Sequence, residues 1–141
     1  MPTVEEKIEE YRERFDTVRE LSGDPTEVFS YIIDLGKRLQ LDPLSESRRT
    51  ESNRVSKCQY DLFVDWDSGQ WRAYSNGLIS SGYAYILLDI FNSVSPEEIH
   101  SVTADTFAPL GIQSLLSMNR SDGFYEMIEI IKRNSAKTVD N

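Results

Sequence analysis

One stretch of the sequence limits the possible folds more than any other: residues 78–91 read LISSGYAYILLDIF and are apolar on nearly every side of a helix. Asp89 is the only charged residue in this stretch. A helix without a polar face has to be enclosed by the rest of the protein. The stretch is also much too short to cross a bilayer, which takes about 20 residues. We therefore predict a central, buried helix over residues 78–91.

Two amphipathic helices are predicted ahead of this stretch. Apolar residues recur every three or four positions from 4 to 21, and Thr3 and Glu6 have the spacing of a reciprocal helix cap. Pro25 opens a second helix over residues 25–39, because proline is favoured at the first helical position. The residues expected to be buried in this second helix are Val28, Phe29, Ile32, Ile33, Leu35 and Leu39.

A β-hairpin is predicted between the second helix and the central one. Residues 59–67 alternate between apolar and polar, residues 67–69 supply a tight turn, and residues 70–76 return as the partner strand. Residues 55–57 are a candidate for a short preceding strand. The alternation favours a solvated face, rather than a metal site, for three acidic residues, Asp61, Asp65 and Asp67.

Further helices follow the central one. We expect a short helix near residues 96–100, one or two helical turns between 103 and 117, and a last helix over 119–137. This order predicts an α+β fold, in which helices pack mainly on one face of a small, curved antiparallel sheet. Residues 1–141 are expected to form a single domain.

Charge argues against two classes of partner. The chain carries 15 Lys and Arg against 24 Asp and Glu, a net charge of -9, so we expect neither nucleic acid nor a membrane as partner.

The first residues are acidic where a targeting leader would be basic, which predicts a cytoplasmic protein. One cysteine and one histidine exclude the usual zinc and iron-sulfur ligand sets.

Cys58 is the residue most open to chemistry. A lone cysteine is most often buried and inert. Here, however, the cysteine falls at the junction of a loop and a strand, between Lys57 and Gln59 and close to Arg54. An accessible thiol near positive charge favours the nucleophilic thiolate form.

Four segments, in the same order along the chain, resemble the SufE family of sulfur-acceptor proteins. They are YIIDLGKRL at 31–39, NRVSKCQYDLFVDW at 53–66, SSGYAYILLDIFNSVSPEEI at 80–99 and LSMNRSDGFYEMI at 116–128. The second segment resembles the active-site segment of the family, in which a cysteine precedes a hydrophobic strand. The resemblance covers residues 25–132 and implies a fold similar to the SufE and NifU-like scaffold fold.

The resemblance also implies a function. A pyridoxal-phosphate (PLP) cysteine desulfurase, of the SufS type, would hold sulfur as an enzyme persulfide, and Cys58 would accept that sulfur. The protein would activate the desulfurase and relay the sulfur to an iron-sulfur scaffold, as a carrier and not as an enzyme. It would need no cofactor of its own.

Three further residues are candidate partner contacts or supporting residues by the same resemblance. Arg120 matches an arginine of the family, although a surface salt bridge would also account for it. Gln59 matches as well, although a polar residue on the outer face of a strand needs no function. Asn76 stands where the family tends to show Asp-Ser-Asp after the hairpin.

Two departures from the family pattern lie beside the cysteine. Lys57, which is also a candidate partner contact or supporting residue, stands where family members usually have glycine, and Tyr60 stands where they have serine. Glycine permits backbone angles that lysine does not. The resemblance therefore leaves the conformation of this loop open.

Two other functions stay open at this point. One is a thiol enzyme, for which His100 is the only histidine available as a base. The other is an interaction module that keeps the fold and binds a desulfurase without sulfur transfer.

Overall fold

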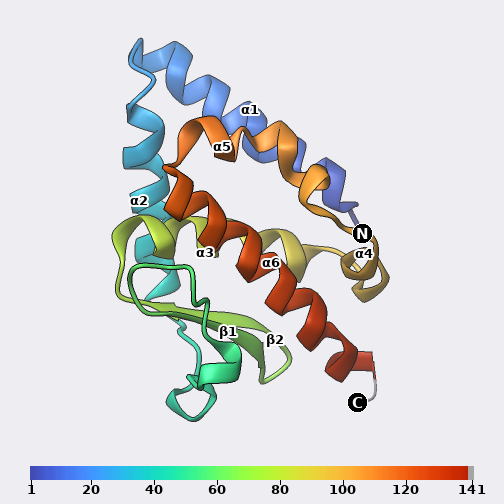
Figure 1. Ribbon diagram of the computed structural model, residues 1–141. Helices are drawn as coiled ribbons and strands as arrows, with labels where there is room; N and C mark the ends of the chain where they lie inside the picture. Colours follow the sequence, from blue (N-terminus) through green and yellow to red (C-terminus); the bar gives the residue numbers. More distant parts are fainter. Residues whose placement is uncertain (140–141) are drawn as a thin grey trace.

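Six α-helices and one hairpin make up the main elements of the computed structural model, which describes residues 1–139 (Figure 1). The helices are α1 (Val4–Ser22), α2 (Glu27–Leu39), α3 (Leu78–Ser93), α4 (Pro96–Ser101), α5 (Ile112–Leu115) and α6 (Met118–Val139). The strands are β1 (Leu62–Asp67) and β2 (Gln70–Ser75). Three 3-10 helices complete the chain: η1 (Glu46–Arg48), η2 (Glu51–Asn53) and η3 (Ala104–Leu110).

The central helix, α3, is buried along almost its whole length, as predicted. It crosses α2 with the two backbones in contact, since a methyl group at Gly82 would lie 2.2 Å from the carbonyl oxygen of Ile32. Its one charge, Asp89, accepts a hydrogen bond from the Tyr11 hydroxyl at 2.6 Å and lies 3.5 Å from the Lys7 ammonium. Within the described residues, no helix has the length and apolar character needed to span a membrane.

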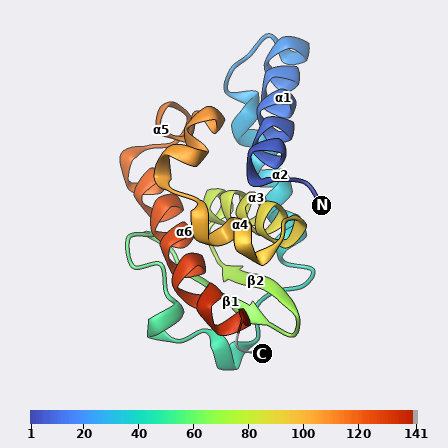
Figure 2. The ribbon, with the colours of Figure 1, turned by 90° about the vertical axis from the view of Figure 1, so that its right-hand side faces the viewer.

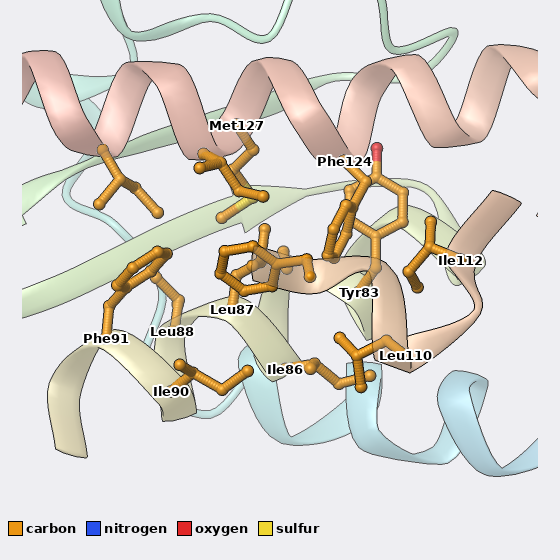
Figure 3. Close-up of a cluster of buried hydrophobic side chains, with 14 of the residues drawn as sticks. Tyr83, Ile86, Leu87, Leu88, Ile90, Phe91, Leu110, Ile112, Phe124 and Met127 are labelled. Atoms are coloured by element: carbon orange, nitrogen blue, oxygen red, sulfur yellow. The ribbon is translucent and has the colours of Figure 1, made fainter. Parts of the chain in front are cut away.

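Aromatic rings fill the space between α3, η3 and α6 (Figure 3). Phe124 of α6 meets Tyr83 and Phe107 edge to face, each at a centroid distance of 5.8 Å. Edge-to-face pairs at this spacing add to the free energy of burial because the positive edge of one ring faces the negative face of the other. This cluster joins the C-terminal helix to the central one.

The hairpin is antiparallel, with Val64 paired to Ala73 and Trp66 to Trp71. Ser68 and Gly69 both have positive φ, at 55° and 88°, as a tight two-residue hairpin turn requires. Figures 1 and 2 show the hairpin near the lower end of the molecule, with α1, α2 and α3 above it. The α+β class, with helices mainly on one side of a small antiparallel sheet, is thus confirmed.

The expectation that Asp65 and Asp67 face solvent is wrong, because both residues are only 4% exposed. Residues 44–54 fold back along the hairpin, and the Leu44 N–H donates to the carbonyl oxygen of Ala73 at 3.0 Å. The carboxylates accept hydrogen bonds from side chains of this segment and of α6. The contacts are Arg48 (3.1 Å), Asn53 (3.2 Å) and Asn134 (3.1 Å) on Asp65, and the N–H (3.0 Å) and hydroxyl of Ser45 on Asp67.

Three smaller differences from the predicted elements remain. Helix α2 begins at Glu27 rather than at Pro25, because Asp24, Pro25 and Thr26 form a turn of their own. Residues 55–57 are not a strand; the preceding residue, Arg54, makes a single bridge to Phe63. Phe29 and Ile33 are half-buried rather than buried, which bears on the site described below.

Asp67→Asn is predicted to lower the free energy of unfolding by about 1–2 kcal/mol at neutral pH, because hydrogen bonds to a charged group are lost. Hydrogen bonds from Ser45 hold the pKa of Asp67 below its ordinary value of 3.8. The stabilisation is therefore complete above that value and is lost as the pH falls through the lower pKa of the folded state. Urea unfolding of both proteins should show a difference that shrinks in acid, and a difference independent of pH would contradict the assignment.

Candidate functional site

Cys58 lies on a short loop that is closed at its base. The Val55 N–H donates to the carbonyl oxygen of Leu62 at 2.8 Å, so that the loop leaves and re-enters the fold at one point. Within the loop, the Cys58 N–H donates to the Val55 carbonyl oxygen at 3.1 Å and closes a tight turn. Val55 is fully buried, whereas Cys58 is half-buried. The thiol is therefore placed at the surface by a firmly anchored turn.

A groove of about 630 Å³ runs beside Cys58. It separates the loop from α2, from the start of α3 and from the start of α6, and apolar and polar side chains share its lining. The residues are Phe29, Ile33, Cys58, Gln59, Tyr60, Asn76, Gly77, Leu78, Ile79, Ser80, Tyr83, Ser117, Asn119 and Arg120. The structure thus brings together four of the five predicted site residues: Cys58, Gln59, Asn76 and Arg120.

Lys57 lies outside this groove. It borders a different hollow, with Asp122 and Glu126 of α6. Arg54, the second cation expected near the thiol, lies 3.4 Å from the carboxylate of Asp61 and stacks over the ring of Phe63. The third cationic residue, Arg120, does line the groove. It lies in the first turn of α6.

The loop accommodates the lysine that replaces the usual glycine. Among described residues other than glycine, Ser68 alone has a positive φ, so Lys57 adopts ordinary backbone angles. Tyr60 packs its ring against Gly77, where an added methyl group would lie 3.0 Å from two ring carbons. Both departures from the family pattern are thus built into the closed loop without backbone strain.

Asn76 fastens the far end of the loop. Its side-chain oxygen accepts a hydrogen bond from the Asp61 N–H at 2.9 Å, and its own N–H donates to the Asp61 carbonyl oxygen at 3.3 Å. Asn76 is at the same time exposed and part of the groove wall. It supports the loop and remains available to a partner.

Tyr83 is a site residue that the sequence did not reveal. It stands on α3 with its hydroxyl toward α6 (Figure 3), and its ring is buried while it also lines the groove. Burial, followed by interaction with the neighbouring Cys58 thiol, raises the pKa of Tyr83, so its hydroxyl stays protonated. A protonated hydroxyl beside a sulfur anion can donate a hydrogen bond to it.

Gly123 makes this arrangement possible. A methyl group at this position would lie 2.6 Å from the Tyr83 hydroxyl oxygen and 3.7 Å from Cα of Cys58. The missing side chain lets the tyrosine and the cysteine loop meet over the same turn of α6. This glycine lies in the segment at 116–128 that resembles the SufE family, but its role depends on two distant segments, which the sequence pattern does not show.

Glu126 is the second site residue that sequence reasoning missed. Its carboxylate accepts hydrogen bonds from the N–H groups of Ser56 (3.2 Å) and Lys57 (2.9 Å) and from the Ser56 hydroxyl (2.7 and 3.0 Å). It joins the turn before Cys58 to α6. Among the residues that the structure describes, no cluster of three or more His, Cys, Asp or Glu side chains could hold a metal ion.

Gly123→Ala is predicted to destabilise the fold by about 1 kcal/mol, because overpacking costs about 1–3 kcal/mol and alanine regains about 1 kcal/mol of helix propensity. Tyr83→Phe removes the oxygen that the new methyl group would meet. The double variant should therefore lose less stability than the sum of the two single variants, as measured by urea unfolding. A Gly123→Ala protein more stable than the wild type would contradict the close packing.

Comparison with known proteins shows the family of the chain and agrees with its fold. Residues 10–135 match the SufE family, described as an Fe-S metabolism associated domain. A SufE-like protein of Synechocystis sp. is 25% identical over 77% of this chain and 70% of its own length. The cysteine desulfuration proteins SufE of Plasmodium falciparum and Plasmodium vivax are each 25% identical over 99% of this chain, which spans 63% and 61% of their respective lengths.

A solved structure shares the same architecture. The solution structure of a hypothetical protein from Thermus thermophilus superimposes with a TM-score of 0.70 over 96% of this chain and 97% of its own, at 19% sequence identity. At that identity the likeness concerns the fold alone. The family match, in contrast, runs from within α1 to within α6 and includes every strand and the whole Cys58 loop. The chain belongs to the SufE family of Fe-S metabolism associated domains.

Proposed function

We propose that this protein accepts sulfur on Cys58 from the persulfide of a PLP-dependent, SufS-like cysteine desulfurase. The observation that carries the proposal is the position of the chain's single thiol, half-buried on an anchored loop at the wall of an open groove. Membership of the SufE family supports it, and so do the names of the two Plasmodium relatives, which describe them as cysteine desulfuration proteins.

The transfer is a thiol exchange without net oxidation. The Cys58 thiolate attacks the outer sulfur of the partner's persulfide, and a new sulfur–sulfur bond forms on Cys58 while the partner's sulfur–sulfur bond breaks. The partner's cysteine leaves as a thiolate, and the proton on the outer sulfur moves with that sulfur. No oxidant or reductant is needed, which suits a chain with one cysteine.

Two groups in the groove are suited to the anionic sulfur. The protonated hydroxyl of Tyr83 can donate a hydrogen bond to the thiolate or the persulfide, and the guanidinium of Arg120 adds positive charge to the lining of the groove. Lys57, which lies outside the groove, stays a candidate for contact with the partner. An electrostatic effect of its ammonium on the thiol also stays a prediction.

The rim of the groove offers a docking surface for the desulfurase. Leu78 and Tyr60 are 65% and 52% exposed although both are large and apolar, and Phe29 and Ile33 continue the apolar surface inside the groove. Exposed apolar side chains grouped around a reactive residue are typical of protein interfaces. Gln59, Asn76 and Arg120 supply the polar contacts around them.

We further propose that docking stimulates the desulfurase and that the sulfur passes on to an iron-sulfur scaffold. In this role the protein is a carrier and not an enzyme. Its place of action, the cytoplasm, stays a prediction from the sequence, as does the organisation of residues 1–141 as one domain.

Two alternatives are separable from this proposal. A thiol enzyme needs a base beside its cysteine, whereas His100 lies in α4 and no histidine occurs among the described residues that line the groove. An interaction module that binds the desulfurase without accepting sulfur would keep the same surface. Only the fate of the sulfur distinguishes that module from a carrier.

Cys58→Ser is predicted to fold normally and to accept no sulfur, because a hydroxyl replaces the only thiol at a surface loop. Intact-mass analysis after incubation with desulfurase and cysteine should show added sulfur on the wild type and none on the variant. Unchanged stimulation of the desulfurase by Cys58→Ser would favour the interaction module instead.

Leu78→Asp is predicted to raise the KM for this protein in the desulfurase assay about tenfold, since burying a leucine contributes roughly 1.5–3 kcal/mol and 1.4 kcal/mol corresponds to a factor of ten. Leu21→Asp is the matched control, because Leu21 is 85% exposed in the last turn of α1. Equal effects of the two substitutions would place the docking surface elsewhere.

A further inference from the structure

Besides the hydrogen bond from the Cys58 N–H to the Val55 carbonyl oxygen, one carboxylate holds the turn that precedes Cys58. Glu126 accepts hydrogen bonds from two consecutive main-chain N–H groups, those of Ser56 and Lys57, and from the Ser56 hydroxyl. Consecutive N–H groups that point to one place form a natural binding site for an anion. The carboxylate comes from α6, 68 residues further along the chain than Cys58 (126 − 58).

Few other contacts restrain this part of the loop. Val55 is fixed by its burial and by the Leu62 carbonyl oxygen, and Asp61 is fixed by Asn76. Between these two ends, the hydrogen bonds that Ser56 and Lys57 donate to side chains of the described residues all go to Glu126. The Cys58 N–H bond to the Val55 carbonyl oxygen closes the turn, and Glu126 is the side chain that fixes this turn against α6.

The same part of α6 holds the other side of the thiol. Gly123 lies one turn before Glu126 and makes room for the Tyr83 hydroxyl beside Cys58. The hydrogen bonds to Glu126 thus hold the turn on α6, where Gly123 and Tyr83 pack beside the cysteine. The result is a thiol turned toward the groove and only half accessible.

We propose that Glu126 is a positioning residue, which holds the Ser56–Lys57 turn on α6 and so keeps Cys58 against Tyr83 until a partner engages the loop. The contact with residue 57 uses the main-chain N–H and not the side chain, so lysine serves as well as glycine at this position. Two sulfur atoms must come within about 2 Å to bond, so this restraint sets how readily Cys58 meets a second sulfur. The inference deepens the proposed function and rests on it.

The test compares Glu126→Gln with Glu129→Gln, which removes the same charge from an exposed position one turn further along α6. A glutamine keeps the size of the side chain but offers one acceptor oxygen instead of two. The rate of Cys58 alkylation by iodoacetamide should rise about tenfold in Glu126→Gln, as expected from the loss of hydrogen bonds to a charged acceptor. Glu129→Gln should alkylate at the wild-type rate.

Amide hydrogen exchange gives a second readout, independent of thiol chemistry. The amides of Ser56 and Lys57 should exchange faster in Glu126→Gln, whereas the amide of Val55, bonded to Leu62, should keep its protection. Ser56→Ala, which keeps both N–H contacts and loses only the hydroxyl, should give a smaller change in both measurements. Uniformly faster exchange across the chain would indicate general destabilisation and would overturn the positioning role.

Alkylation and exchange need no desulfurase, so they can fail separately from sulfur acceptance. Equal alkylation rates in Glu126→Gln and Glu129→Gln would overturn the positioning role, even if wild-type Cys58 accepts sulfur. Absence of sulfur on the wild type would refute the proposed function, even if Glu126→Gln releases the loop.

Discussion

The enclosure of α3 is the constraint on which the rest of the structure depends. A helix that is apolar all round requires neighbours on every side, and here α2 crosses it at backbone contact while α6 and β2 cover other faces. Asp89 is tolerated because Tyr11 and Lys7 of α1 meet it. The start of this helix forms part of the groove, so the enclosed helix at the centre of the fold also borders the thiol.

The site depends on residues from segments that are far apart in the sequence. The loop supplies Cys58, α3 supplies Tyr83, and α6 supplies Arg120, Gly123 and Glu126. Of these five residues, the sequence identified only the cysteine and the arginine as candidate site residues. Half-burial between these elements is a compromise, because full exposure would leave the sulfur unguarded and full burial would keep a partner out.

Features set by local contacts were predictable, and features set by distant contacts were not. The Thr3–Glu6 cap, the hairpin turn and the helix over 78–91 follow from neighbouring residues and agree with the structure. Asp65 is buried because Arg48, Asn53 and Asn134 donate hydrogen bonds to it. The alternation of residues along one strand contains no information about these distant partners. Glu126 was likewise invisible, because on its own helix it is simply one of several acidic residues.

Helix α6 contacts the groove, the cysteine loop and the hairpin. Its first turn carries Arg120 at the groove, Glu126 meets the cysteine loop, and Asn134 reaches the buried carboxylate of Asp65 in the hairpin. Damage to the hairpin therefore loosens the helix that shields the thiol. Cys58 is in consequence a built-in reporter: its rate of chemical labelling measures how often the cysteine loop leaves α6, without any added probe.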